Sequence, residues 1–270
     1  MKMTAIITLT TDFGLKDGNV GVMKGVILAI APHAPLVDIS HLIPPQNVRE
    51  ASLILRRSAP YFPPDTVHVV VVDPGVGTAR RPIAARLGSQ YFVGPDNGIL
   101  TLLLEYAEER GWLTEFVYLD QPQFWRAEIS HVFHGRDIFA PAAAHLANGK
   151  PLLALGSPIR DPLRLILPRP GRAGNVLSGE IIHIDHFGNL AANIRQEHLQ
   201  EELAVGLKVS VHLAGAVIHG LARTFGDRPP GALTALWGST GSLIISVVNG
   251  SAAETLRVQV GDAVQVVVED

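Results

Sequence analysis

The sequence predicts a two-domain α/β protein. An N-terminal α/β domain with a central, mainly parallel sheet is expected over residues 1–171, and a C-terminal antiparallel β-barrel domain over residues 172–270. Three observations support this division. Strands and helices alternate along the first part, a polar, proline-rich segment ending in Gly-Arg-Ala-Gly follows, and short β-rich runs separated by turns make up the rest. A chain of 270 residues with 47% hydrophobic residues can bury two cores.

The central strand of the first domain is predicted at Val69 to Val72, four valines without a polar residue between them. Such a run is typical of a strand that is covered on both faces by helices. The run ends at Asp73, and the following Pro-Gly predicts a tight turn that holds this carboxylate in place. Ligands of open α/β sheets bind beyond the strand ends, so Asp73 is a candidate for chemistry. An ordinary surface turn is the alternative.

The remaining elements follow from the same periodicities. Apolar runs predict strands, and apolar residues three or four positions apart predict helices, with Asn47 as the cap of one of them. In the first domain the predicted strands are 5–10, 36–39, 82–86 and 91–93, and the predicted helices are 20–30, 47–59 and 99–109. In the second domain the predicted strands are 179–185, 190–194, 207–213, 232–237, 242–248 and 264–268.

Composition excludes several classes of function. Lys and Arg number 22 against 25 Asp and Glu, without a basic run, so neither a nucleic acid nor a membrane surface is expected as a partner. The absence of cysteine excludes disulfides, thiolate metal sites and a cysteine nucleophile. No apolar run is long enough to span a bilayer, and the N-terminal apolar segment does not have the pattern of a signal peptide. We therefore expect a cytoplasmic protein.

Polar residues near two predicted elements could form one cluster. His134 precedes Gly135 and an Ala-rich stretch of helical character, so it is expected at the positive end of a helix. With Asp73 and Arg80 it would form a carboxylate, guanidinium and imidazole group that orients and polarises water. Arg80 stays protonated, so its expected task is to fix and balance the charge of Asp73. A capping or core histidine is the other interpretation of His134.

The second domain carries the motif HIDHFGNLAAN, which leaves three interpretations open. His183, Asp185 and His186 are of the residue types that bind metals, although strand alternation would turn His186 away from the other two. The motif is also compatible with a polar strand face that enters a turn. In the third interpretation, Asp185 and Asn189 bind a ribose or an amino-acid group.

Taken together, the motifs resemble those of the S-adenosyl-L-methionine hydroxide adenosyltransferases, also called SAM hydrolases, which are related to the fluorinase and chlorinase. The resemblance is carried in order by TLTTDFGLKDGNVGVMKG, VDPGVGTARR, YFVGPDNG, FHGRDIFAPAAAHLA, IDHFGNLAANI and GSTGSLIISVVNGSAAE. It implies a homotrimer in which each active site lies between the N-domain of one subunit and the C-domain of its neighbour. It also implies cleavage of S-adenosyl-L-methionine by water or hydroxide at the 5′ carbon, giving adenosine and L-methionine without a metal or cofactor.

The resemblance also assigns roles to residues. The family's water-activating triad falls on Asp73, Arg80 and His134, and the halogenating relatives lack this acid and this histidine. Asp12 matches the acid that holds the ribose hydroxyls. The other matched positions are Asn189 in the nucleoside site, Asp17 and Ser239 near the methionine amino and carboxyl groups with Asp185 beside them, Phe225 as an adenine-stacking ring, and Val247 and Asn249 with backbone groups near the adenine. Gly238 departs from the family pattern, which has Asn before the serine.

Two rival functions belong to other classes. A metal-dependent hydrolase would use His183, Asp185 and His186 together with Asp73. A non-catalytic nucleoside-binding protein would use Asp12, Asn189 and Phe225 and leave the triad idle. A dinucleotide oxidoreductase is disfavoured, because the glycines after the first strand, at positions 14, 18, 21 and 25, lack the phosphate-binding spacing.

Overall fold

The computed structural model describes residues 5–269. The chain divides into two compact units, Met1–Leu165 and Ile166–Asp270, each of which is described separately below. The domain boundary that the sequence predicts between residues 171 and 172 stays a prediction. The helices within residues 5–269 are too short or too polar to span a bilayer.

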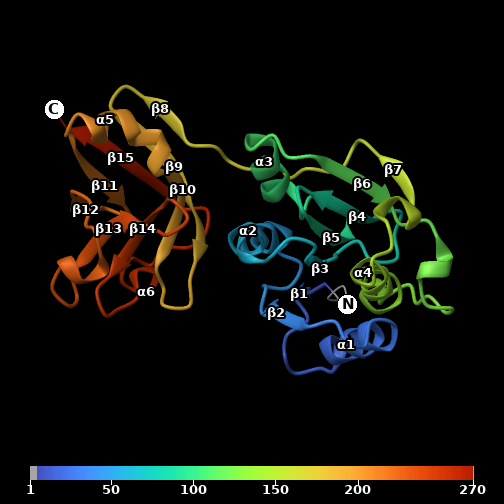
Figure 1. The fold of residues 1–270 in the computed structure, drawn as a ribbon. Helices are drawn as coiled ribbons and strands as arrows, with labels where there is room; N and C mark the ends of the chain where they lie inside the picture. The colour runs from blue at the N-terminus through green and yellow to red at the C-terminus, as the bar shows by residue number, and fades with distance from the viewer. Residues whose placement is uncertain (1–4, 270) are drawn as a thin grey trace. The chain divides into compact units, whose positions relative to one another are not determined.

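The first unit contains a seven-stranded mixed sheet in the order β2-β1-β3-β5-β4-β6-β7 (Figure 1). Its strands are β1 (Ile7–Thr11), β2 (Leu36–Ser40), β3 (Val67–Val71), β4 (Pro82–Leu87), β5 (Gln90–Pro95), β6 (Thr114–Tyr118) and β7 (Ser157–Ile159). The pairings β2–β1, β1–β3 and β3–β5 are parallel, whereas β4 pairs antiparallel with β5 and β6, and β6 with β7. The predicted α/β class is confirmed.

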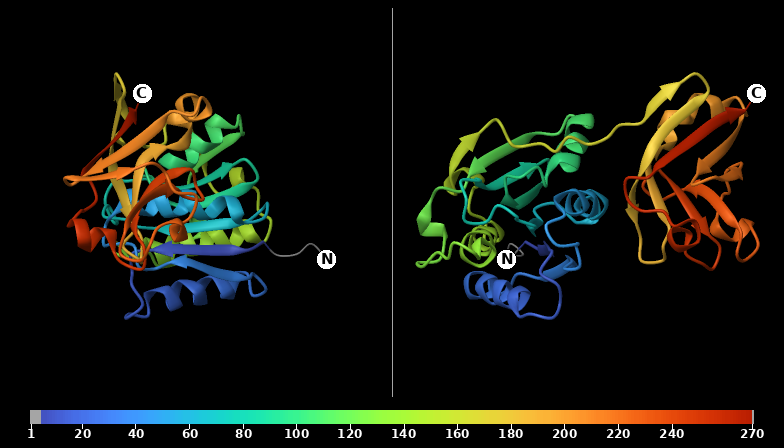
Figure 2. Two further views of the ribbon diagram at one scale, coloured as in Figure 1. Left: turned by 90° about the vertical axis from the view of Figure 1, so that its left-hand side faces the viewer. Right: turned by 180° about the vertical axis from the view of Figure 1, so that it is seen from behind.

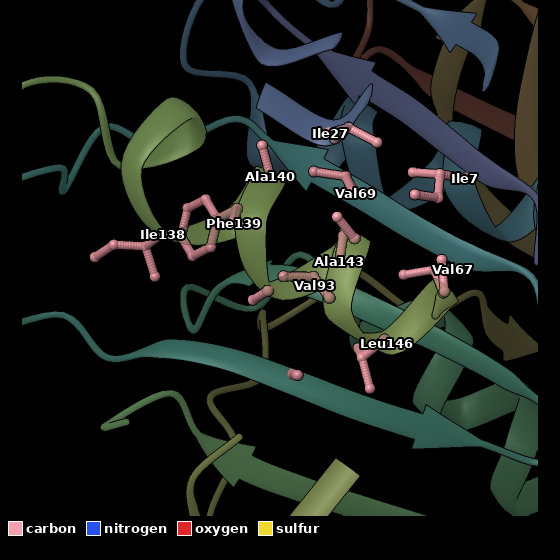
Figure 3. Packing of buried hydrophobic residues seen from close by; sticks show 14 of the residues in the cluster. Ile7, Ile27, Val67, Val69, Val93, Ile138, Phe139, Ala140, Ala143 and Leu146 are labelled. Atoms are coloured by element: carbon pink, nitrogen blue, oxygen red, sulfur yellow. The ribbon is translucent and has the colours of Figure 1, made fainter. Parts of the chain in front are cut away.

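Helices cover both faces of this sheet. They are α1 (Asn19–Ile30), α2 (Val48–Ser58), α3 (Thr101–Glu109) and α4 (Ala140–Ala147). Residues of α1 and α4 share one buried core with Val67, Val69 and Val71, and residues of α2 and α3 share a second core with Val70 and Val72. Figure 3 shows part of the first core, where Val69 lies near Ile27 and the start of α4. The valine run is therefore buried on both faces, as predicted.

The sheet brings distant strand ends to one edge. Thr11 at the end of β1 is in parallel register with Val71 at the end of β3. Asp12 and Asp73 follow these strands, so both carboxylates lie at the carboxyl edge where α/β sheets bind ligands. The sheet topology thus explains why acids that are far apart in sequence belong to one region.

The second unit contains an eight-stranded antiparallel sheet in the order β12-β11-β15-β9-β10-β14-β13, with β8 paired to β9 (Figure 2). The elements are β8 (Gly171–Ala173), β9 (Val176–Ile184), β10 (Leu190–Arg195), α5 (Gln200–Ala204), β11 (Lys208–Leu213), β12 (Ala216–His219), β13 (Leu233–Trp237), β14 (Ser242–Val247), α6 (Ala252–Leu256) and β15 (Ala263–Glu269). A bridge between Ala222 and Leu236 brings the two ends of the strand order together. The sheet is nearly closed around one core, which confirms the predicted β-barrel.

Candidate active site

Asp73 and Arg80 form a buried ion pair on the loop that follows β3. The Arg80 Nε atom donates to both carboxylate oxygens, at 2.8 Å to Oδ1 and 2.9 Å to Oδ2, and Nη2 also donates to Oδ2. The two side chains are only 5% and 8% exposed. Several charge-assisted hydrogen bonds in a poorly solvated place give this pair a defined geometry.

His134 completes the cluster from a different element. It immediately precedes the π-helical turn Gly135–Phe139, which continues into α4. Its Nδ1 atom lies 2.8 Å from Arg80 Nη2. A guanidinium can only donate, so Nδ1 accepts, and the proton of the neutral imidazole is assigned to Nε2. The structure therefore brings the three predicted triad residues into one chain of hydrogen bonds.

The electrostatic surroundings keep His134 neutral. Burial lowers the pKa of its imidazole, and the nearby charge of Arg80 lowers the pKa further. Asp73 and Asp137 act in the opposite direction without cancelling these effects. At neutral pH His134 thus presents Nε2–H as a hydrogen-bond donor.

The loop that carries Asp73 and Arg80, for which a catalytic role is predicted, and the segment before His134 approach each other closely. Gly77 has a φ of +75°, and a Cβ atom placed there would lie 2.2 Å from the carbonyl oxygen of His131. Any larger residue would push the two backbones apart. This contact fixes the tip of the loop that carries Asp73 and Arg80.

Asp137 is a structural acid that the sequence interpretation did not single out. It is fully buried and accepts from Arg136 Nε at 2.6 Å and from the backbone N–H of Ser130 at 2.8 Å. Burial acts to raise the pKa of Asp137, but the hydrogen bonds from Arg136 and Ser130 outweigh it and hold the pKa below its usual value. The charged Asp137 ties the segment before His134 to the π-helical turn. The sequence signal was an acid directly after HGR.

Asp12 lies at the same sheet edge as Asp73. Its Oδ2 atom accepts from the backbone N–H of Gln46 at 2.8 Å. Gln46 has a φ of +64°, a strained conformation for a residue with a side chain. Asp17 is exposed on the loop between β1 and α1. The first unit therefore contains Asp12 and Asp17, two of the three acids predicted for substrate binding, as well as the triad.

Asn189 and Asp185 form one hydrogen-bonded turn in the second unit. Asp185 Oδ1 accepts from the backbone N–H groups of Phe187 and Asn189, each at 2.9 Å, and Oδ2 accepts from Asn189 Nδ2 at 2.8 Å. The buried Ser246 hydroxyl donates to Asn189 Oδ1 at 2.5 Å. Asp185 thus holds the side chain of Asn189 in place. Ser246, which sequence interpretation missed, does so from β14.

The metal interpretation of this motif receives no support from the geometry. Asp185 and His186 lie beyond the end of β9, so strand alternation does not govern their directions. Within residues 5–269, no three His, Asp or Glu side chains gather into a group that could hold a metal ion.

The other residues predicted to bind the substrate lie in turns or at strand ends of the second unit. Phe225 is 47% exposed in a short turn after β12. Ser239 is exposed between β13 and β14, Val247 is the last residue of β14, and the exposed Asn249 follows with a φ of +57°. Exposed turn residues of this kind are available to a ligand.

Comparison with known proteins identifies the family. Residues 7–156 match the SAM hydroxide adenosyltransferase N-terminal domain, and residues 179–265 match the C-terminal domain. The chain is 41% identical to an (R)-S-adenosyl-L-methionine hydrolase of Salinispora arenicola, over 98% of this chain and 99% of that protein. It is 32% identical to a fluorinase of an Actinoplanes species, over 77% of each chain. A crystal structure of an uncharacterized conserved protein from Thermotoga maritima matches with a TM-score of 0.89 at 40% sequence identity. The match covers 97% of this chain and 100% of the other chain. The chain belongs to the SAM hydroxide adenosyltransferase family.

Proposed function

We propose that this protein hydrolyses S-adenosyl-L-methionine, in the (R) form named for its relative, to adenosine and L-methionine. The observation that carries the proposal is the hydrogen-bonded chain of Asp73, Arg80 and His134 in a member of this family. The rival metal-dependent hydrolase and idle nucleoside-binding protein have no comparable observation in their favour.

The reaction needs a positioned nucleophile more than an acid. Water attacks the 5′ carbon, a carbon–oxygen bond forms, and the carbon–sulfur bond breaks with its electron pair going to sulfur. Methionine leaves as a neutral thioether, and the surplus proton of the attacking water passes to solvent. Holding the water in line with the breaking carbon–sulfur bond can contribute several orders of magnitude to such a step.

The triad supplies this positioning. Arg80 holds Nδ1 of His134, so the imidazole offers Nε2–H to one lone pair of the water oxygen and directs the other lone pair of this water toward carbon. Asp73 fixes the guanidinium that sets this direction. His134 therefore acts as a donor that orients water, and its lowered pKa keeps it in the neutral form that the role needs.

The remaining predicted residues would bind the substrate. Asp12 would accept from the ribose hydroxyls, and Asn189 would contact the nucleoside. Asp17 and Ser239 would lie near the methionine amino and carboxyl groups with Asp185 beside them, Phe225 would stack on adenine, and Val247 and Asn249 would contact it through backbone groups. The two hydrogen bonds between Asp185 and Asn189 support a role for Asp185 in presenting Asn189. An acid such as Asp17 would also attract a cationic substrate.

Assembly, location and cofactor use are further parts of the proposal. We infer a homotrimer in the cytoplasm, with a domain boundary between residues 171 and 172 and with each site formed by the N-domain of one subunit and the C-domain of its neighbour. The reaction would proceed without a metal ion. The support is the family membership and the location of Asp12 and Asn189 in different units.

A product assay in ¹⁸O-labelled water tests the function. The purified protein is incubated separately with the (R) and the (S) form of the substrate, in the presence of a chelator and physiological chloride. It should release adenosine and methionine in equal amounts from the (R) form. The label should appear in the 5′ hydroxyl of adenosine, since attack occurs at that carbon. A 5′-halogenated nucleoside as the main product, or strict dependence on a divalent ion, would overturn the proposal.

A further inference from the structure

The segment 94–98, of sequence GPDNG, comprises the end of β5 and the turn that follows it. It has no role in the proposed function, yet it holds both ends of the catalytic loop, which carries Asp73 and Arg80. Asn97 Nδ2 donates to the carbonyl oxygen of Val72 at 2.9 Å, directly before Asp73. Asp96 Oδ2 accepts from Arg81 Nε at 2.9 Å, directly after Arg80. Two consecutive residues of one turn thus fasten the loop on either side of its functional residues. We call this pair the Asp96–Asn97 clamp.

Asp96 is buried, Asn97 is partly buried, and hydrogen bonds define the direction of both side chains. Asp96 is only 2% exposed, and its Oδ1 atom accepts from the backbone N–H of Leu163 at 2.8 Å. Asn97 Oδ1 accepts from the N–H of Ile99 at 3.2 Å, so its amide nitrogen is the group that faces Val72. An unpaired group left in such a place costs more than an exposed one, so the clamp resists rearrangement.

Arg81 extends the clamp to the end of the first unit. Its Nη1 donates to Asp161 Oδ1 at 2.9 Å, and its Nη2 donates to the carbonyl oxygen of Asp161 at 2.8 Å. Arg81 therefore spans Asp96 and Asp161, a multidentate arrangement that a guanidinium, but not an ammonium, can make.

We propose that the Asp96–Asn97 clamp positions Asp73 and Arg80 against His134 for catalysis. The inference rests on the proposed roles of these three residues. Its physical basis is that the 2.8 Å contact between Arg80 and His134 joins two separate segments and so depends on where the loop is held. A displacement of about 1 Å in a catalytic group can cost roughly a hundredfold in rate.

Two isosteric variants test the clamp. Asp96→Asn removes the charge that Arg81 meets, and Asn97→Asp keeps the acceptor for Ile99 but turns an oxygen toward the Val72 carbonyl. Each should lower kcat roughly ten- to a hundredfold and leave the adenosine affinity measured by calorimetry unchanged. Glu108→Gln is the matched control, because it breaks the exposed pair with Arg164 next to the same terminal segment without touching the loop.

A measurement without substrate distinguishes an effect of the clamp on the position of Arg80 from an effect on the stability of the fold. Burial is the largest cause of the lowered pKa of His134; Arg80 and His131 lower this pKa further, while Asp73 and Asp137 raise it. If the clamp variants move Arg80 away, NMR titration of His134 should show its pKa closer to the ordinary value. Glu108→Gln should leave that pKa unchanged.

The outcomes distinguish the proposals. Wild-type kcat and wild-type His134 pKa in both clamp variants, or a lower Tm alone, would refute the clamp. If both variants fail to fold, Arg81→Lys decides by the same readouts, since lysine keeps a charge at Asp96 but cannot span to Asp161. A wild-type protein without hydrolase activity would refute the function, and the titration would still decide the clamp.

Discussion

The side chain of His134 is confined by one neighbour to one tautomer. Arg80 donates to Nδ1, so a role for His134 in proton abstraction at Nε2 would require a proton to leave that atom first. The role that we propose for His134, as a donor to water, agrees with this contact. The triad and the binding residues should therefore differ in their kinetic signatures.

Removing a group that acts on water should cost rate, and removing a binding group should cost affinity. His134→Ala should lower kcat roughly a hundredfold or more with little change in adenosine binding. Asp73→Asn, which removes the charge opposite Arg80, should also lower kcat. Asp12→Ala should weaken adenosine binding, since a charge-assisted hydrogen bond is worth about 1.5–3 kcal/mol. Calorimetry and product chromatography measure the two effects, and near-normal turnover in both triad variants would show that the triad is assigned wrongly.

The pH dependence of turnover should reflect the lowered pKa of His134. The neutral imidazole is the active form, and burial together with Arg80 moves its protonation to a pH below that of an ordinary histidine. In a pH profile of kcat/KM, which reports the ionisation of the free enzyme, activity should hold as pH falls to about 6.5 and decline only below it. A decline that begins well above this value would contradict the assigned protonation state.

Residue type and position, at a strand end for Asp73 and before a helix for His134, were enough to suggest a cluster with Arg80. The family resemblance then assigned these residues to a triad. Asp137 and Ser246 could not be found in this way, because each acts through a contact that only the folded chain creates. Ser246 looks like any serine of a barrel strand until β14 lies beside β10 and its hydroxyl reaches Asn189.

At the scale of elements, strand β3 carries a buried histidine. His68 is fully buried, contacts Thr8 Oγ1 through Nδ1 at 2.8 Å and stacks on Phe92 at 4.8 Å between ring centroids. Burial lowers its pKa to about 3. The unfolded chain binds a proton near pH 6.5 and the folded chain does not, so stability falls as pH drops from about 6.5 toward 3, by at most about 1.4 kcal/mol per pH unit.

The variant His68→Gln should flatten this dependence, because glutamine can still pair with Thr8 but does not titrate. Denaturant unfolding of both proteins at several pH values measures the difference in slope. Equal slopes for the two proteins would mean that His68 does not carry the acid sensitivity.

The catalytic loop should tolerate no side chain at position 77. Gly77→Ala meets both the strain of a positive φ, roughly 1–2 kcal/mol, and the carbonyl of His131 at 2.2 Å from the added Cβ. Gly174→Ala is the control, with a φ of +58° but open space around an added Cβ among the described residues. The Tm of thermal unfolding and kcat should both fall more in Gly77→Ala than in Gly174→Ala. Equal losses would show that the contact with His131 is not decisive.

Elements with strong periodicity were predicted well and short ones were not. Asn47 was expected to cap a helix, and its Oδ1 atom accepts from Glu50 N–H at 2.9 Å. Strands β6, β7, β8 and β12 were not predicted. β7, β8 and β12 have only three or four residues, too few for a periodic pattern. The π-helical turn after His134 depends on packing and on the buried Asp137.

At the scale of the whole molecule, a shared site predicts complementation between inactive subunits. If Asp73 and Asn189 of one chain serve different sites, Asp73→Ala and Asn189→Ala proteins should each be inactive and should regain activity when their subunits are exchanged. A mixed trimer contains an interface that carries neither lesion. Sedimentation measures the assembly and product chromatography the activity. An active monomer would rule out the shared site.

The hydrogen bonds at the end of the first unit define a joint for chimeric enzymes. Leu163 and Leu165 donate their backbone N–H groups to Asp96 and to Thr101 Oγ1, each at 2.8 Å. The fully exposed Ile166 comes directly after them. A hybrid that takes its second unit from a halogenating relative should therefore be joined at Ile166, since an earlier joint would exchange residues that belong to the support of the catalytic loop.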